Sequence, residues 1–371
     1  MATEIRQQSA LILSHIKSVS KVNPTFSLFD HILARTLRGH WSMACLSEND
    51  DFYQGLRADF DREIEAEKSN PSVKNPLPLS IREFIDNIYS RFVKNPAQVS
   101  TYQEDFHALW YMFIRAAQNI DAESAEQDRL FNQLVYAKEL GATLGGEDVS
   151  AWIYLPYLVE DFEEAWVDNS RKLSPSKRRN FAAFTARLLA LGACDVNISL
   201  CALWLLRETL ETTRAIGPDP YVQQLAISEI LPAVVEWFHI SSTKLLKLAV
   251  HEWSDGKSIT DIALPGALAQ AEGIQQPGFS IFRWVFWRNR LGELYYHEGA
   301  DGVRANAKKA FDHMILTGRL LGHEIPGEKT YWSVVFRRLD RELQRSGKAS
   351  VGLEDILPEP GWANEPESED E

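Results

Sequence analysis

The fold is decided by one aromatic stretch, residues 279–290, which reads FSIFRWVFWRNR. Wound as an α-helix, this stretch and the residues that follow it present a wide apolar face. That face consists of Trp284, Trp287, Leu291 and Leu294, with Phe282 and Phe286 beside them. An apolar sector of this width is too broad for a helix on the surface. We therefore expect a central core helix that is held by Trp284 and Trp287.

Two arginines flank the same helix, and the sequence leaves two functions open for them. Arg283 and Arg290 are seven residues apart, which places them on a common flank where they can meet carboxylates of other helices. Alternatively, they line a pocket for an anionic ligand together with Trp287. Arg283, Trp287 and Arg290 are therefore the candidate residues for contact with a ligand or a partner.

The rest of the chain repeats the helical pattern. Apolar residues recur at spacings of three and four, and runs that alternate like strands are hard to find. The fold class is therefore all-α, a multi-helix body of antiparallel helical hairpins. The predicted helices are 2–19, 26–41, 51–68, 81–94, 102–120, 125–140, 151–168, 176–191, 198–212, 221–238, 242–252, 280–296, 303–321 and 331–346.

Local signals set some of the helix ends and the arrangement of the helices. Ser80 and Glu83 form a capping box, and Ser174-Pro175 fits an N-cap followed by proline at the first helical position. The segments LPYLVEDF (155–162) and LPAVVEWF (231–238) are similar. Their spacing is compatible with stacked helical hairpins in a solenoid. The explanation that we favour is that two core helices use the same residue types independently.

Composition divides the chain into three parts. Residues 69–79 carry prolines at 71, 76 and 78, which is typical of a linker. We expect a helical arm at 1–70, a main helical domain at 80–347 and a disordered acidic tail at 348–371. Residues 353–371 contain eight carboxylates and no Lys or Arg, so they account for most of the net charge of −13. Such a segment buries too little apolar surface to fold.

Charge and cysteine usage limit the partners and the compartment. The body outside the tail is slightly negative, which argues against broad contact with duplex nucleic acid. We find no secretion signal and no apolar run long enough to cross a membrane. Only three cysteines occur, Cys45, Cys194 and Cys201, and we expect no disulfide between them. The predicted location is the cytoplasm, with the nucleus as the alternative.

Motifs for catalysis and metal binding are incomplete. Gly256-Lys257-Ser258 lacks the glycine that a phosphate-binding loop needs five residues earlier, and the histidines show no paired spacing for zinc. Asp161, Glu164 and Asp168 share a helical face, which we interpret as a solvated acidic surface. The cysteines lie in apolar sequence that raises thiol pKa. We therefore predict no metal and no cofactor, and the sequence leaves any catalytic residues unknown.

A basic group lies between the acidic segment and the following helix. It consists of Arg171, Lys172, Lys177, Arg178 and Arg179. These side chains are candidates for contact with the acidic tail, an interaction that salt would weaken. The alternatives are a weak nuclear-import-like patch and the solvated start of a helix, and we favour the last.

The aromatic helix also carries a resemblance. Its motif is Arg283-Trp284-x-Phe286-Trp287-x-x-Arg290, and the accompanying residues are Asn180, Phe181, Ala183, Phe184, Ala186, Arg187, Leu188, Leu210, Glu211, Trp110, Asp128, Leu130, Val135, Trp152 and Trp166. Over residues 80–345 the chain resembles a fungal family of uncharacterised helical proteins, domain of unknown function 3632. The resemblance implies a fungal source and a helical, cytosolic protein, and it implies no catalytic residues.

Two functions remain open at this point. We favour an intracellular protein-interaction scaffold without enzymatic activity, because stacked helices expose long faces for partners. The alternative is an accessory protein or enzyme of fungal small-molecule metabolism with an aromatic-lined pocket. The expected partners are a protein or a small anionic ligand; duplex nucleic acid and membranes are not expected.

Overall fold

Helices account for the regular secondary structure in the part of the chain that the computed structural model describes. The described residues are 46–69, 77–94, 99–142, 150–219, 221, 223–254, 262–297, 301–346 and 357–358. No strand occurs among them, so the all-α prediction is confirmed. The chain divides into two compact units, Met1–Phe162 and Glu163–Glu371.

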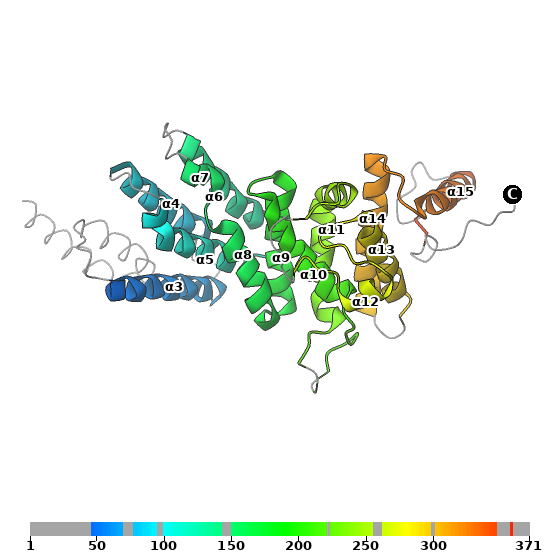
Figure 1. Cartoon of the computed structure of the whole chain (residues 1–371), viewed down its shortest axis with the longest axis horizontal. Helices are drawn as coiled ribbons and strands as arrows, with labels where there is room; N and C mark the ends of the chain where they lie inside the picture. Colours follow the sequence, from blue (N-terminus) through cyan, green and yellow to red (C-terminus); the bar gives the residue numbers. More distant parts are fainter. Residues whose placement is uncertain are drawn as a thin grey trace, which may run out of the picture. The chain divides into compact units, whose positions relative to one another are not determined.

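The first unit is built around one buried helix, α5. Its elements are α3 (Leu46–Ser69), α4 (Leu77–Lys94), η2 (Val99–Tyr102), α5 (Gln103–Asn119), α6 (Ala125–Ala142), α7 (Ser150–Tyr154) and α8 (Leu158–Glu164), which crosses the border to the second unit. α5 packs against α3, α4 and α6 (Figure 1). It buries Phe106, Trp110 and Phe113. The buried carboxylate of Asp105 on α5 accepts a hydrogen bond from Tyr53 of α3 at 2.9 Å and pairs with Arg91 of α4 at 2.7 Å.

Two sequence-predicted boundaries in this region are wrong. α4 begins at Leu77, so Ser80 lies inside the helix and donates a hydrogen bond to Glu63 Oε2 at 3.0 Å instead of capping it. Pro78 is accommodated because the first helical turn needs no N–H from it. The helix predicted at 151–168 is interrupted where Leu155 and Tyr157 adopt positive φ values of 50° and 64°. Pro156 disfavours the helical conformation of the residue before it.

The second unit is built around α11, which lies between α9 and α14 (Figure 1). Its elements are the single π-helical turn η4 (Ala165–Asn169), η5 (Ser170–Lys172), α9 (Pro175–Leu191), η6 (Val196–Ile198), α10 (Ser199–Leu210), α11 (Ile227–Val250), α12 (Ala267–Ala271), α13 (Ile281–Tyr295), α14 (Asp301–Leu321) and α15 (Glu328–Ser346). Ser174 caps α9 as predicted, since its side chain accepts from the N–H of Lys177 at 3.3 Å. We predicted two helices at 221–238 and 242–252, whereas α11 is continuous through Ser241, whose hydroxyl donates to the carbonyl of Trp237 one turn earlier.

The aromatic stretch forms α13, and its predicted core face is confirmed. Trp284, Trp287, Leu291 and Leu294 are buried. Trp284 meets Phe238 of α11 edge to face, with ring centroids 5.7 Å apart. The apolar face is narrower than predicted, because Phe282 is 71% exposed. Ser280 begins the helix by accepting from the N–H of Arg283 at 3.2 Å.

Several predictions concern residues outside the described part of the chain. These are the helices at 2–19 and 26–41, Cys45, the linker residues 70–76 and the tail apart from Leu357 and Pro358. Those two residues are buried, and the carbonyl of Pro358 accepts from Tyr331 Oη at 3.3 Å. The solenoid arrangement and the domain boundaries stay predictions. Among the described helices, none is long and apolar enough to cross a membrane.

Candidate functional site

Arg283 of α13 is a fully buried cation whose N–H groups point at protein oxygens. Nε and one terminal nitrogen donate to the two carboxylate oxygens of Glu211, each at 2.9 Å. The other terminal nitrogen donates to the carbonyls of Ala263 at 2.9 Å and Gly278 at 2.6 Å. A longer contact of 3.4 Å reaches the carbonyl of Leu264. The five donors of this guanidinium are thus all used within the protein.

Glu211, directly after α10, holds the other side of this cluster. Its Oε1 accepts from the indole N–H of Trp287 at 2.6 Å, and its Oε2 accepts from the backbone N–H of Gly266 at 2.5 Å. Its backbone carbonyl also accepts from the N–H of Leu268 at 2.9 Å. A Cβ added at Gly266 would lie 2.7 Å from Glu211 Cβ, so glycine permits this approach. We call Glu211, Arg283 and Trp287 the core clasp, because together they fasten the segment before α12 to α10 and α13.

The structure brings together two of the three predicted ligand candidates. Arg283 and Trp287 share the core clasp, where the guanidinium carbon lies 5.6 Å from the ring centroid of Trp287. Arg290 is half-buried at the side of α13 and pairs with Glu293 of the same helix. Arg288 is the second buried arginine of this helix, and it donates to the carbonyl of Pro326 at 2.6 Å.

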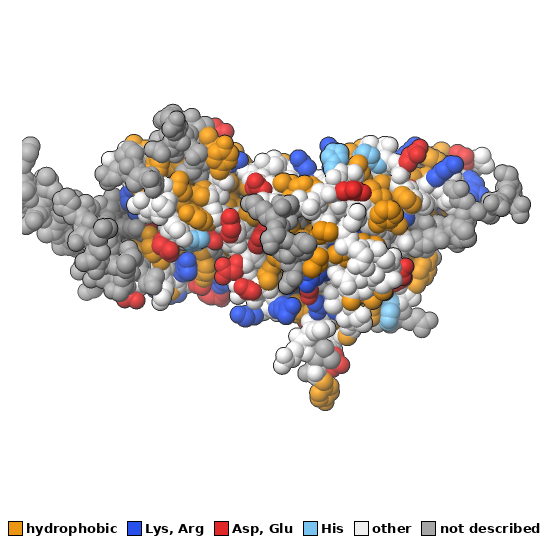
Figure 2. Space-filling model, in the orientation of Figure 1, with side chains coloured by type: hydrophobic (Ala, Val, Ile, Leu, Met, Phe, Trp, Pro, Cys, Tyr) orange, Lys and Arg blue, Asp and Glu red, His pale blue; other side chains and the backbone are white. Residues whose placement is uncertain are grey.

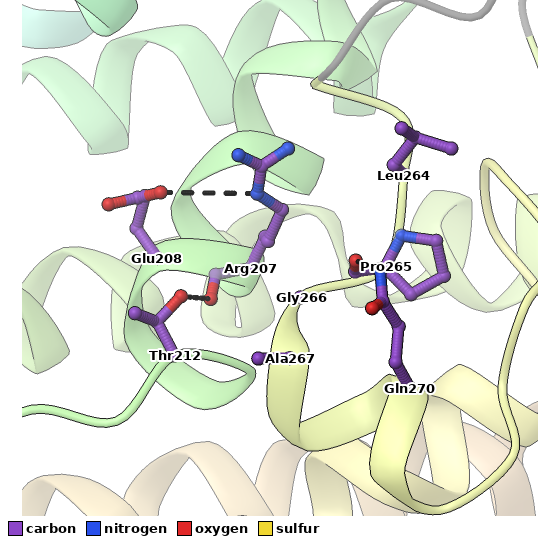
Figure 3. Close-up of a pocket in the computed structure, with 8 residues that line it drawn as sticks. All are labelled: Arg207, Glu208, Thr212, Leu264, Pro265, Gly266, Ala267 and Gln270. Carbon is purple, nitrogen blue, oxygen red and sulfur yellow. Dashed lines mark hydrogen bonds and ion pairs between the residues drawn. The ribbon is translucent and has the colours of Figure 1, made fainter.

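A pocket of about 400 Å³ includes Gly266 and Leu264, whose backbones bond to the core clasp, and Figure 3 shows the residues that line it. It is lined by Arg207, Glu208, Thr212, Leu264, Pro265, Gly266, Ala267 and Gln270. The Thr212 hydroxyl donates to the carbonyl of Arg207 at 3.0 Å, and the Gln270 amide donates to the carbonyl of Pro265 at 2.7 Å. In Figure 3 the side chain of Arg207 extends between α10 and the segment around Leu264.

Three guanidinium groups surround the one carboxylate at this pocket. Glu208 bonds Arg214, and it lies 3.8 Å from a terminal nitrogen of Arg171 and 3.9 Å from Nε of Arg207. Arg214 is also fixed by the carbonyl of Leu225 at 3.0 Å, and burial lowers its pKa. Three positive charges therefore lie near one negative charge at the edge of the pocket. Within the described residues the terminal nitrogens of Arg207 have no hydrogen-bond partner, so they can bind an anion.

The basic group that we predicted as a tail contact divides into two kinds of side chain. Arg171 and Lys172 are exposed, Lys177 is half-buried, and half-buried Arg179 pairs with Glu236 at 2.6 Å. The interpretation as a solvated helix start is wrong for Arg178, which is fully buried. Its guanidinium donates to three backbone carbonyls, those of Ser170, Leu173 and Glu229. Contact between the basic group and the tail stays a prediction.

The predicted acidic surface is also divided. Glu164 and Asp168 are exposed, as expected for a solvated face. Asp161 instead meets His107 of α5, whose Nδ1 lies 2.8 Å from Oδ1 and 3.0 Å from Oδ2. The sequence does not indicate this pair, because the two residues are 54 positions apart and only tertiary packing brings them together.

Of the two cysteines in the second unit, Cys201 is a buried core residue and Cys194 is half-buried. Cys194 and Cys201 are not joined by a disulfide. Burial raises the pKa of the Cys201 thiol, which keeps it protonated and unreactive.

Comparison with known proteins supports the family resemblance and adds one relative. Residues 110–291 match the family model described as protein of unknown function (DUF3632), a range that includes the core clasp and the pocket. The resemblance found in the sequence is confirmed over that range. The chain is 28% identical over 247 residues to "Oxopyrrolidines biosynthesis cluster protein G" of Penicillium oxalicum. This alignment covers 61% of the chain and 69% of that relative. No solved structure matches.

Proposed function

Because the family match assigns no activity and the relative carries the name of a biosynthesis cluster, we propose that this chain is a helical scaffold in fungal small-molecule biosynthesis. In this role it holds a partner protein and carries out no reaction itself. We place it in the cytoplasm, which a fluorescent fusion expressed in the fungus would test.

The observation that carries the proposal is the closed geometry of the core clasp. Arg283 and Trp287 are the residues that would mark an aromatic-lined anion pocket. Both are completely buried, and their donors are bonded to Glu211 and to backbone carbonyls. A desolvated guanidinium with every donor satisfied stabilises a fold and offers nothing to a ligand. The core clasp therefore supports a structural role for the motif. In this proposal the exposed surfaces of the helices bind the partner protein.

A specific observation favours a second function, the binding of a small anionic metabolite at Arg207. The pocket has room for a compact molecule and is surrounded by an excess of positive charge. No described residue accepts a hydrogen bond from the terminal N–H groups of Arg207. Such groups can donate two parallel hydrogen bonds to one carboxylate or phosphate. The Gln270 amide across the pocket can contact a polar group of the same molecule.

The first experiment tests the scaffold directly. The full chain is mixed with each purified enzyme of the biosynthesis in which it takes part, and binding is measured by calorimetry. We expect a saturable complex with at least one enzyme and no conversion of any intermediate by the chain alone. Catalytic turnover by the purified chain would contradict the proposal.

The second experiment tests the anion pocket. Candidate carboxylates and phosphates are screened by thermal shift against the wild type and two variants, Arg207→Ala and Arg290→Ala. Arg290→Ala is the control for Arg207→Ala, because the two arginine side chains are equally accessible, with 26% and 25% of their surface exposed. A ligand of the pocket loses its stabilising shift in the first variant and keeps it in the second. Equal shifts in all three proteins would exclude binding at Arg207.

A further inference from the structure

Two histidines from different helices meet on the surface of the second unit. His239 lies on α11 and His313 lies on α14, two helices that pack against each other. Nδ1 of His239 and Nε2 of His313 are 3.3 Å apart, and the ring centroids are 4.8 Å apart. His239 is exposed and His313 is half-buried. Figure 2 shows histidine side chains side by side over α11 and α14.

We propose that His239 and His313 form a binding site for a divalent transition-metal ion. Imidazole nitrogen binds such ions at about 2.0–2.1 Å. Two nitrogens 3.3 Å apart then subtend an angle of about 107° at the metal, close to the tetrahedral value. Imidazole suits copper, nickel and zinc, and affinity is highest for Cu²⁺.

Each imidazole can act as a ligand through the nitrogen that faces the other ring. These nitrogens are Nδ1 of His239 and Nε2 of His313. Binding requires each ring to keep its proton on the nitrogen that faces away from the ion. Asp312 is engaged with Lys308 at 2.9 Å, and the positive charge of Lys309 opposes a cation.

The helices hold the two rings at a fixed register. One turn further along α14, the Thr317 hydroxyl lies 2.7 Å from both the Ser242 hydroxyl on α11 and the carbonyl of His313. These buried contacts fasten the two helices directly beneath the histidine pair. In the described part of the chain, no group of three or more His, Cys, Asp or Glu side chains could hold a metal. The site therefore supplies two ligands and leaves the remaining positions to water or to a donor from a bound molecule.

The sequence could not indicate this site. The two histidines are 74 positions apart, whereas the motifs for metal sites place ligands within one or two turns of one helix. Our expectation that the chain binds no metal depended on such local spacing.

The test uses the full chain without a histidine tag. Cu²⁺ is titrated by calorimetry, and the nitrogen ligands are counted by electron paramagnetic resonance. We expect one saturable ion with two coordinated nitrogens, and a rise in melting temperature because the ion binds only the folded protein. His239→Ala and His313→Ala should each lose the saturable phase. His251→Ala, which removes an exposed histidine at the end of α11, should retain it.

Two further results decide the proposal. Lys309→Ala should bind Cu²⁺ more tightly than the wild type, because it removes a repelling charge. The melting temperature of each variant without the ion shows whether that variant is folded. If His313→Ala does not fold, the result for His239→Ala decides the proposal, because His239 is exposed. Binding that is unchanged in folded His239→Ala would overturn the site, as would the absence of a saturable ion in the wild type.

Discussion

The core clasp makes a quantitative prediction for Glu211→Gln. The substitution keeps the shape of the side chain and removes the negative charge that Arg283 faces at 2.9 Å in a completely buried setting. Removal of one partner from a buried ion pair costs about 3–5 kcal/mol, because the other charge stays desolvated. Gln also loses one of the two acceptors that the guanidinium uses. We therefore expect the free energy of unfolding of the second unit to fall by about 3–5 kcal/mol.

The assay is thermal unfolding followed by calorimetry. For a unit of this size, each kcal/mol shifts the melting temperature by about 2–4 °C, so the transition of the second unit should fall by about 6–20 °C. Glu211 lies outside the first unit, Met1–Phe162, whose own unfolding therefore serves as an internal reference.

Arg290→Met is the matched control on the same helix. Arg290 is half-buried and pairs with Glu293, an arrangement that contributes at most about 1 kcal/mol. The double variant Glu211→Gln, Arg283→Met should lose less than the sum of the two single losses, because the second change removes the unpaired charge. If Glu211→Gln melted no earlier than Arg290→Met, the clasp would not stabilise the fold and the reasoning would be refuted.

Three further variants follow from the same structure. Trp284→Ala should lose about 3–5 kcal/mol, measured by denaturant unfolding, because it leaves a cavity beside Phe238; unchanged unfolding would mean that the ring is not in the core. Burial raises the pKa of Glu328 from 4.5 to about 8, so the wild type should lose stability as pH rises through this range while Glu328→Gln does not. Parallel pH profiles would contradict that assignment. Gly278→Ala should lower the melting temperature, since Gly278 has φ +83° and an added Cβ would clash with the carbonyl oxygen of Trp253; an unchanged melting curve would count against this geometry.

Local sequence predicted the features that depend on neighbouring residues. The cap at Ser174 and the buried face of Trp284 and Trp287 follow from side-chain chemistry within a few turns, and the structure has both. The start of α4 was missed because a proline in the first turn looks the same as a proline in a linker. The break before α8 depends on the conformation of Leu155, which the helical spacing on either side conceals.

The contacts that form the candidate site join residues that are far apart in the sequence. The sequence makes Arg283 a candidate for ligand contact, but its partner Glu211 is 72 positions away. The sequence does not show that the two residues are in contact. It therefore cannot distinguish a core arginine whose donors are all bonded from an arginine that is free to bind an anion. The sequence does not indicate Arg207 as an anion-binding candidate, because that role depends on the positions of Glu208, Arg171 and Arg214 in the folded protein.

Amide hydrogen exchange of Gly266 and Leu268 tests the central claim most directly. Both N–H groups are bonded to Glu211, one to its side chain and one to its backbone carbonyl. If the core clasp is structural, these amides exchange only when the second unit opens, with a protection free energy near that of its unfolding, and Glu211→Gln accelerates the exchange. Exchange in the wild type as fast as in an unprotected loop would contradict the account.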